Sequence, residues 1–380
     1  MNEKTILVIG PEPPPATGME LATQALLAEL GRADIRFARV DTADPADMLG
    51  NRGKWTLHNI SLALRHLLDA ARAISRRETC AVYVPIAQEF PGLVRDVAFL
   101  LVARAGRVPT IVHLHGGAFR EFYASRAKPV QWLIRKTVGG AALGIVLTEK
   151  LRPALECVIP AERVTVVPNG IDMANPPRRH RSSETVRILF LSSLIRWKGP
   201  LVFIDAFARA HRRCPFLRAT LAGDWASAEI RSETVRLASE LGVAEQLEFP
   251  GAVDDEKKRA LFHAADIFCF SSLVPEGQPL VILEAMGAGL PVVAPAWPGI
   301  ADTVIDGQSA LLVAPNSPRA LAEKLVELAG DPEKRLRLGA AGRRRYEELF
   351  TQRAFGDRMS EVLRPFVERP SRALTQARAR

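Results

Sequence analysis

Short apolar runs and longer amphipathic stretches alternate along most of this chain. The short runs are rich in Val, Ile and Leu, which is typical of strands buried on both faces of a parallel sheet. Between them, apolar residues recur every three or four positions, which predicts helices. In the first half, the expected strands are Thr5–Gly10, Ala81–Val84, Thr110–Leu114, Gly144–Leu147 and Val164–Val167, and the expected helices include Met19–Leu30, Leu57–Ile74 and Leu93–Ala105.

A polar stretch rich in Pro and Arg, Met173–Glu184, interrupts this alternation and is typical of a linker between domains. The alternation then restarts, so each half predicts a doubly wound α/β domain. A length of 380 residues also favours two domains over one. In the second half, the expected strands are Val186–Leu191, Leu217–Ala222, Gln246–Phe249, Ile267–Phe270, Pro291–Ala294 and Ala310–Val313, and the expected helices include Leu201–Ala210, Ala228–Leu241, Asp255–Ala264, Leu280–Met286 and Arg319–Leu328.

These patterns divide the chain into domains and a tail. Residues 1–175 and 185–350 are expected to form two Rossmann-like domains. Residues 351–368 contain one more expected helix, Ala354–Val367. Residues 369–380 have few apolar side chains, so we expect a frayed basic tail.

The chain is basic, with a net charge of +9 and an isoelectric point near 9.7. Its arginines concentrate in Arg178–Arg181, in Arg343–Arg345 and from Arg353 to Arg380. A basic surface attracts nucleic acid, anionic lipid and anionic substrates alike, and a high arginine content of a whole proteome would explain the charge equally well. The charge therefore leaves the class of partner open.

Cysteine use and hydropathy indicate a compartment. The four cysteines are widely spaced and include no Cys-x-x-Cys, which is typical of reduced thiols in a cytosolic protein. The first ten residues do not resemble a signal peptide, and no apolar run approaches the roughly 18–20 residues needed to span a bilayer. We therefore expect a cytoplasmic protein that is soluble or peripheral on a membrane.

The segment Phe268–Ala294 carries the most informative chemistry. Two strand-like runs flank a short apolar helix, and two carboxylates, Glu276 and Glu284, lie eight positions apart. Gly277 loosens the turn between them, and Pro279 suits the first position of a helix. The N–H groups and dipole at a helix start favour phosphate. A phosphate seat beside two acceptor-only groups suits a sugar nucleotide.

Two further segments place polar side chains after strands. Leu189–Pro200 reads LFLSSLIRWKGP, in which a strand end and a loop containing Lys198-Gly199 precede a helix. Thr110–Gly117 reads TIVHLHGG, which puts His113 and His115 at the carboxyl edge of a sheet, where open α/β folds bind ligands.

The context EGxxxxxxEAMxxGxPVV resembles the Glu-x7-Glu motif of the retaining glycosyltransferases of family 4. The resemblance spans most of the chain and is strongest from Arg187 to Val313. It implies the GT-B fold, in which two Rossmann-like domains face a central cleft and the last helix crosses back onto the N-terminal domain. It also implies sugar transfer from a nucleotide-diphosphate sugar to a glycan or lipid-linked acceptor, most often in bacterial envelope or exopolysaccharide synthesis on the inner face of the plasma membrane.

The resemblance also implies roles for individual residues. Glu276 would bind hydroxyl groups of the donor sugar, Glu284 the ribose hydroxyl groups, and Lys198 the leaving diphosphate. His115 would contact the transferred sugar or its phosphate. Other positions that match the family's donor site are Gly18, Asp224, Gly251, Gly277, Gln278, Leu280 and Val281.

The sequence departs from the family pattern at three places. Ser193 stands where an arginine is usual, and Arg196 either supplies the missing guanidinium or is simply solvated. Gly18-Met19 replaces the common Gly-Gly. Pro279 stands where many relatives have glycine and removes one N–H donor.

No Asp-x-Asp and no His/Cys cluster with metal spacing occurs, so we expect neither a metal nor a cofactor besides the sugar nucleotide as co-substrate. Two alternatives remain. A nucleotide-sugar 2-epimerase on the same fold would consume donor without an acceptor. A nucleic-acid-binding protein would explain the charge, although no motif for that function accompanies it.

Aromatic and basic residues mix after the His-x-His strand. Phe119, Phe122, Tyr123 and Trp132 alternate with cationic side chains. This mixture is compatible with contact to an anionic membrane or a lipid-linked acceptor, and equally with an amphipathic helix packed on its own domain.

Overall fold

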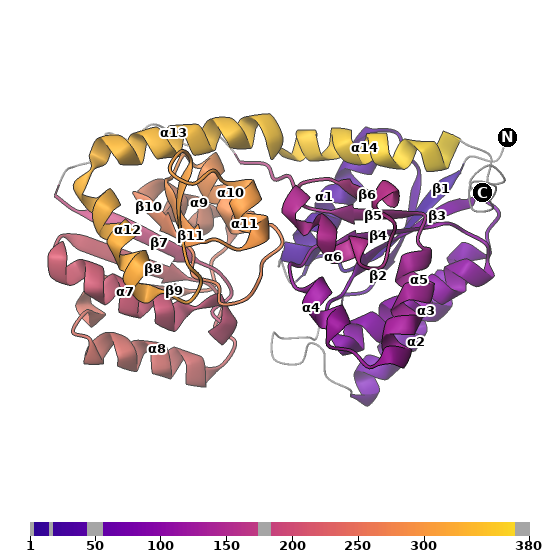
Figure 1. Ribbon diagram of the computed structural model, residues 1–380, viewed down its shortest axis with the longest axis horizontal. Coiled ribbons are helices and arrows are strands. Elements are labelled where there is room, and N and C mark those ends of the chain that lie inside the picture. Colours follow the sequence, from indigo (N-terminus) through magenta and orange to yellow (C-terminus); the bar gives the residue numbers. More distant parts are fainter. Residues whose placement is uncertain (1–3, 15–17, 44–55, 174–183, 369–380) are drawn as a thin grey trace. The chain divides into compact units, whose positions relative to one another are not determined.

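The computed structural model describes residues 4–14, 18–43, 56–173 and 184–368. The chain divides into two compact units (Figure 1). Unit 1 is Met1–Gly170 together with Gln352–Arg380, and unit 2 is Ile171–Thr351. Most of the expected linker and the whole expected tail lie outside the described residues.

Unit 1 is a parallel six-stranded sheet with the order β2-β1-β3-β4-β5-β6. From β1 the chain first crosses to β2 on one side and then to β3 on the other side. The strand order therefore reverses between β1 and β3, which is the switch point of the sheet. The strands are β1 (Thr5–Gly10), β2 (Phe37–Asp41), β3 (Thr79–Ile86), β4 (Thr110–Leu114), β5 (Leu143–Val146) and β6 (Val164–Val166). The helices are α1 (Gly18–Arg32), α2 (Leu57–Ile74), α3 (Phe90–Ala105), α4 (Phe119–Ala124), α5 (Lys128–Thr137), α6 (Arg152–Glu156) and α14 (Gln352–Glu368).

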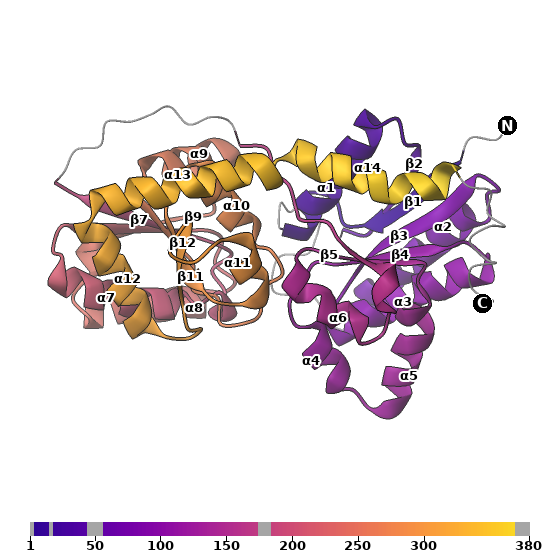
Figure 2. The ribbon, with the colours of Figure 1, turned by 45° about the horizontal axis from the view of Figure 1, so that its top comes forward.

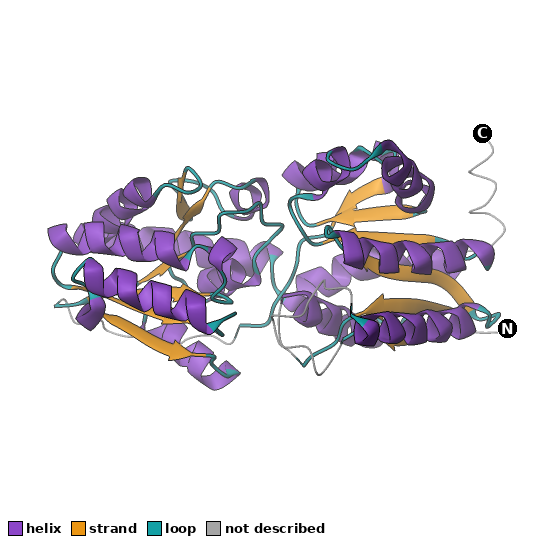
Figure 3. Ribbon diagram, turned by 90° about the horizontal axis from the view of Figure 1, so that it is seen from below, coloured by secondary structure: helices purple, strands orange, loops and turns teal. Residues whose placement is uncertain are grey.

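Helices cover both faces of this sheet because its strands are apolar on both sides (Figure 3). Leu7 and Ile9 of β1 pack in the core beneath α2 and α3, whereas Ile6 and Val8 pack with α1 and α14. The alternation follows from the two-residue period of a strand.

The helix α14 packs against α1, although it follows unit 2 in the sequence (Figure 2). Its apolar side chains Phe355, Met359, Leu363 and Phe366 are buried in the core of unit 1. A Cβ atom on Gly356 would lie 2.0 Å from a carboxylate oxygen of Glu29, so the two helices approach closely at this glycine.

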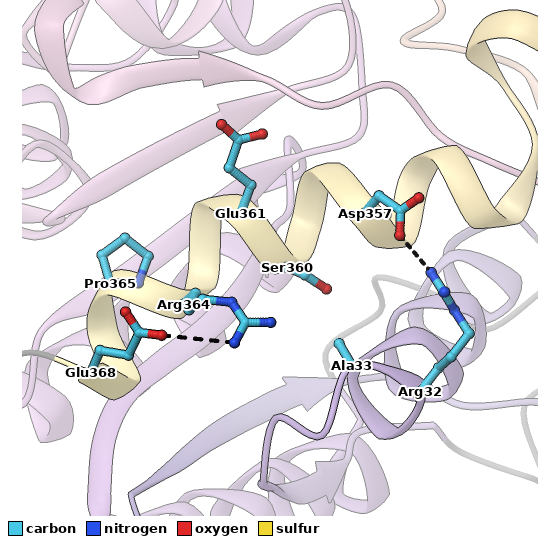
Figure 4. Close-up of a pocket in the computed structure, with 8 residues that line it drawn as sticks. All are labelled: Arg32, Ala33, Asp357, Ser360, Glu361, Arg364, Pro365 and Glu368. Carbon is cyan, nitrogen blue, oxygen red and sulfur yellow. Dashed lines mark hydrogen bonds and ion pairs between the residues drawn. The ribbon is translucent and has the colours of Figure 1, made fainter.

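A cavity of about 490 Å³ lies between the end of α1 and α14 (Figure 4). Arg32 donates to Asp357 Oδ1 at 2.9 Å across it. Because α1 runs back from the carboxyl end of β1, this cavity lies at the amino edge of the sheet. Ligands of open α/β sheets bind at the other edge, so the cavity is a packing feature of α14.

Unit 2 is a second parallel six-stranded sheet, with the order β12-β11-β10-β7-β8-β9. Its core consists of two apolar clusters, one on each face. The strands are β7 (Val186–Leu191), β8 (Leu217–Ala222), β9 (Leu247–Gly251), β10 (Ile267–Cys269), β11 (Val292–Pro295) and β12 (Ala310–Val313). The helices are α7 (Pro200–Arg213), α8 (Ala228–Glu240), α9 (Asp255–Ala264), α10 (Leu280–Gly287), α11 (Pro298–Thr303), α12 (Pro318–Gly330) and α13 (Pro332–Leu349).

Every expected strand is confirmed, five of them with the bounds that the sequence predicted, and the two doubly wound sheets are confirmed with them. The apolar pattern does not predict β2 or several helices, of which α13 is the longest. The Arg343–Arg345 cluster lies on α13, where Arg343 and Arg345 donate to backbone carbonyls of Gly287, Asp302 and Thr303. These two arginines are therefore structural.

Candidate functional site

The strand order of unit 2 locates its ligand-binding edge. In sequence order within this unit, the strands run 3-2-1-4-5-6, so β7 and β10 are neighbours whose following helices pack on opposite faces. The loops after such a pair of strands diverge and leave a crevice at the carboxyl edge of the sheet. Lys198 follows β7 and Glu276 follows β10.

Lys198 and Glu276 form a partly buried ion pair. The Nζ atom of Lys198 lies 2.7 Å from Oε1 of Glu276, and the two side chains are 24% and 13% exposed. The buried hydroxyl group of Ser272 donates to the same oxygen at 2.6 Å. Among the described residues, both donors to this carboxylate bind Oε1, which leaves Oε2 for a hydroxyl group of a ligand.

Close backbone contacts hold the loop after β7 against the loop after β10. Gly199 has φ +77°, and a Cβ atom there would lie 2.1 Å from the carbonyl oxygen of Ser271. Ser271 Oγ donates to the Gly199 carbonyl at 2.9 Å, and the Leu273 N–H donates to the Trp197 carbonyl at 2.8 Å. Since only glycine tolerates this approach and this φ, the loops fix Lys198 beside Glu276.

The helix α10 starts next to this ion pair. Pro279 is its N-cap residue, with φ −64° and ψ 122°, and the helix begins at Leu280. The expected helix start at Leu280 is confirmed, and Pro279 is the N-cap residue rather than the first helical residue. Leu280 and Val281 are the first two helical residues, whose N–H groups have no acceptor within the helix, so they point a partial positive charge toward the crevice.

The approach to α10 is tightly packed. Gly277 and Gln278 are buried, and Gln278 Nε2 donates to Thr303 Oγ1 of α11 at 3.2 Å. A Cβ atom on Gly299 of α11 would lie 1.5 Å from the Gly277 carbonyl oxygen. Gln278 is thus held by its own unit, and what Gly277 offers a ligand is backbone.

Glu284 lies in the body of α10 and pairs with Lys258 of α9. Lys258 Nζ lies 2.8 Å from Glu284 Oε1. Burial raises the pKa of Glu284, and the ammonium group of Lys258 opposes this shift. The sequence does not single out Lys258, because this residue lies in a run of charged residues, DDEKKR, that is typical of a solvated helix start.

The ends of β7, β8 and β9 complete the edge. The Leu194 N–H donates to the Asp224 carbonyl at 2.7 Å, and the Gly223 N–H donates to the Gly251 carbonyl at 2.8 Å. Ser193 is partly exposed and the Asp224 side chain is exposed. Ser193, Asp224 and Gly251 therefore lie along one strip of backbone, as their positions after neighbouring strands predict.

Arg196 lies apart from the Lys198–Glu276 pair. Its guanidinium group binds both carboxylate oxygens of Glu233 on α8, one of them at 3.2 Å, and its side chain is 56% exposed. The structure therefore does not bring Arg196 to Lys198, and Arg196 would have to leave Glu233 to contact a diphosphate.

Unit 1 places its candidate residues at the carboxyl edge of β4. His113 is fully buried and its Nδ1 atom lies 2.6 Å from the Tyr83 hydroxyl group, whereas its Nε2 atom is buried without a hydrogen bond among the described residues. His115 is half-buried and its ring centroid lies 4.0 Å from that of His113. Burial lowers the pKa of His115 to about 4, so its imidazole is neutral near pH 7.

Gly18 is the first residue of α1 and is exposed. The loop that precedes it lies partly outside the described residues. Tyr83 and Ser272, which contact candidate residues, are also not predicted by the sequence. Each lies in an apolar strand or at its end, and neither has a local signal that points to a partner in another segment.

No helix in the described ranges is both long enough and apolar enough to cross a bilayer. The same ranges contain no group of three His, Cys, Asp or Glu side chains placed to hold a metal ion.

Known families match both halves of the chain. The family model described as "Glycosyl transferases group 1" matches residues 174–345, and "Glycosyltransferase Family 4" matches residues 18–175.

Curated relatives match part of the chain. The chain is 34% identical over 193 residues to a D-inositol 3-phosphate glycosyltransferase of Corynebacterium efficiens, and the match covers 47% of this chain and 45% of that protein. It is 30% identical to the GDP-mannose-dependent alpha-(1-6)-phosphatidylinositol monomannoside mannosyltransferase of Mycolicibacterium smegmatis, over 54% of this chain and 57% of that protein. The chain thus spans about half the length of the curated relatives it matches.

Solved structures match over nearly the whole chain. Anabaena HepE in complex with UDP aligns with a TM-score of 0.72 at 20% identity, covering 95% of this chain and 100% of that one. Sucrose-phosphate synthase from Thermosynechococcus elongatus aligns with a TM-score of 0.75 at 21% identity, covering 95% and 98%. At these identities the likeness shows a shared fold.

Proposed function

Since this chain belongs to glycosyltransferase family 4 and has the GT-B fold, we propose that it is a retaining glycosyltransferase that uses a nucleotide-diphosphate sugar. The acceptor is a hydroxyl group of a glycan or a lipid-linked saccharide, in polysaccharide biosynthesis. The observation that carries the proposal is the Lys198–Glu276 pair at the switch point of unit 2, beside the start of α10.

The geometry of unit 2 supports separate roles for the residues around the start of α10. Lys198 and the N–H groups of Leu280 and Val281 stabilise the negative charge of the diphosphate as the bond between the anomeric carbon and the diphosphate breaks. Glu276 accepts hydroxyl groups of the donor sugar, and Glu284 accepts those of the ribose. Anabaena HepE, a structural neighbour, binds UDP, which fits a nucleotide in such a site.

The chemical step then needs no strong protein base. The acceptor hydroxyl group attacks the anomeric carbon on the face from which the diphosphate leaves, and a diphosphate oxygen takes its proton. His115 is proposed as a neutral hydrogen-bonding partner of the transferred sugar or its phosphate. Because side chains and amides supply the counter-charge in this proposal, we expect transfer to persist in excess EDTA.

A panel of UDP-, GDP- and ADP-sugars tests the proposal, since a bound donor raises the melting temperature. We expect at least one donor to stabilise the wild type and not Glu276→Ala. Incubation of that donor alone separates the rival activity, because a 2-epimerase would convert it without an acceptor. A protein that no sugar nucleotide stabilises, but that binds nucleic acid with strong salt dependence, would overturn the proposal.

We further propose that unit 1 contacts an anionic membrane through α2, α3 and α5, which pack side by side. On α2, Leu57, Leu64 and Leu68 lie on one helical face and are 88%, 57% and 57% exposed. On α5, Trp132 is 61% exposed, and the helix carries three basic residues and no acidic one. Exposed apolar side chains among basic ones favour anionic headgroups.

Flotation with vesicles tests this surface. We expect the wild type to bind vesicles that contain anionic phospholipid, and Leu64→Glu with Leu68→Glu to reduce binding about tenfold. Leu336→Glu is the matched control, because Leu336 is 72% exposed on α13 of unit 2. Equal vesicle binding by the α2 variant and the control would contradict the proposal that this surface contacts the membrane.

A further inference from the structure

We infer that Lys258 is a positioning residue for Glu284, which it holds in one orientation and in its ionised form as an acceptor of hydroxyl groups from the donor's nucleoside. This inference rests on the proposed function of the site. It concerns a lysine on α9, outside the two loops that carry Lys198 and Glu276.

The contact is short and partly buried. Lys258 Nζ lies 2.8 Å from Glu284 Oε1, and the two side chains are 21% and 10% exposed. Asp255, one turn earlier on α9, lies 3.3 Å from the same ammonium group. The start of α9 is itself fixed, because Asp254 accepts a hydrogen bond from the Lys257 N–H at 2.8 Å. Lys258 is thus held at two points, and its hydrogen bond selects the orientation of Glu284.

A carboxylate this deeply buried needs a counter-charge to stay ionised. Burial raises the pKa of Glu284, Lys258 opposes that shift, and Asp255 acts in the same direction as burial. From α13, which also packs on α10, Arg343 donates to the Gly287 carbonyl and pairs with Glu347. β11, the strand after α10, is VVAP and has no ionisable side chain. Lys258 is therefore the cation that pairs with Glu284 among the described groups facing it.

The arrangement repeats that of Glu276. On either side of the start of α10, a lysine from another segment binds Oε1 of a glutamate, at 2.7 Å for Lys198 and 2.8 Å for Lys258. An ionised carboxylate only accepts hydrogen bonds, so the ligand must supply donors. The hydroxyl groups of a ribonucleoside meet this requirement. A protonated Glu284 would carry a donor of its own and would lose part of this affinity.

Calorimetric titration with UDP, GDP and ADP tests the inference on the full chain. For the nucleotide that the wild type binds most tightly, we expect Lys258→Met to weaken affinity about tenfold at pH 7. The loss of affinity on acidification should also begin at a higher pH in Lys258→Met, because Glu284 then becomes protonated more easily. Lys258→Arg should retain most of the wild-type affinity, because it keeps a cation at this position. Lys257→Met is the matched control, since Lys257 is the exposed neighbour on the same helix, and it should behave like the wild type.

Three results would overturn the inference. Unchanged affinity of Lys258→Met would show that the lysine does not act on the nucleotide. Weakened affinity with an unchanged pH dependence and a lowered melting temperature would show a structural role alone. If the wild type binds none of the three nucleotides, the proposed function fails together with the inference, which distinguishes this result from the first two.

Discussion

Lys198 and Glu276 are 78 residues apart in the sequence, yet their side chains meet with Nζ 2.7 Å from Oε1. The contact joins the loops after two adjacent strands whose connections run in opposite directions. A cation and an acceptor are thereby placed where a parallel sheet leaves its crevice open.

Removing either member of this pair should abolish transfer. We expect Lys198→Ala and Glu276→Ala to lower turnover by about 10²–10³-fold or more, because each removes a charged group aimed at the diphosphate or the sugar. Steady-state turnover with the cognate donor measures the effect, and circular dichroism checks the fold. Near-normal turnover in either variant would refute these assignments.

Arg196→Ala should have a small effect. The Arg196 side chain is exposed and binds Glu233 of α8, so its loss should change turnover less than about threefold. The comparison variant is Glu233→Gln, which frees the guanidinium group. If Arg196→Ala loses activity about tenfold while Glu233→Gln retains it, Arg196 leaves its partner and replaces the arginine that family members have at the position of Ser193.

Gly199→Ala should destabilise unit 2 beyond the cost of its backbone conformation. Gly199 and Gly242 have similar φ angles, +77° and +72°. A Cβ atom on Gly199 would clash with the backbone of Ser271, whereas a Cβ atom on Gly242 would have no atom within 4 Å. We expect Gly242→Ala to cost about 1 kcal/mol and Gly199→Ala more than about 2 kcal/mol. Urea unfolding measures both, and equal losses would argue against the close approach of the two loops.

Acidification should weaken unit 1 through His115. Burial lowers the pKa of His115 to about 4 in the folded chain, below the value of about 6.5 for an unfolded histidine. Between pH 6.5 and 4 the unfolded chain binds a proton at His115 that the folded chain does not bind. The contribution of neutral His115 to the free energy of unfolding is therefore fully present above pH 6.5 and is lost as the pH falls toward 4. His115→Asn should reduce this pH dependence, measured by thermal unfolding from pH 7.5 to 5. An unchanged pH dependence in His115→Asn would show that another group causes the loss of stability.

The sequence predicts most of this fold because nearly every strand is buried on both faces and therefore reads as an apolar run. The edge strand β2 is less buried and does not read in this way. Its sequence FARVD carries Arg39 and Asp41 at exposed positions, which hides the strand from an apolar pattern. The helix α13 is hidden similarly, since its 18 residues are mostly charged or small and bury few side chains.

For the site, the motif predicts residue types but not their contacts. Glu276, Glu284 and Lys198 follow from local patterns, whereas the pairing of Lys258 with Glu284 depends on how α9 packs beside α10. The direction of Arg196 is equally non-local, because a turn of three residues, Arg196–Lys198, aims two basic side chains at different partners.

The place of α14 in the chain constrains how the protein is made. Unit 1 begins to leave the ribosome first, but the four apolar side chains that complete its core, from Phe355 to Phe366, are synthesised after all of unit 2. The face of α1 that receives them remains uncovered by α14 during that interval. Nascent unit 1 is therefore an incomplete domain that exposes a hydrophobic surface until α14 has left the ribosome.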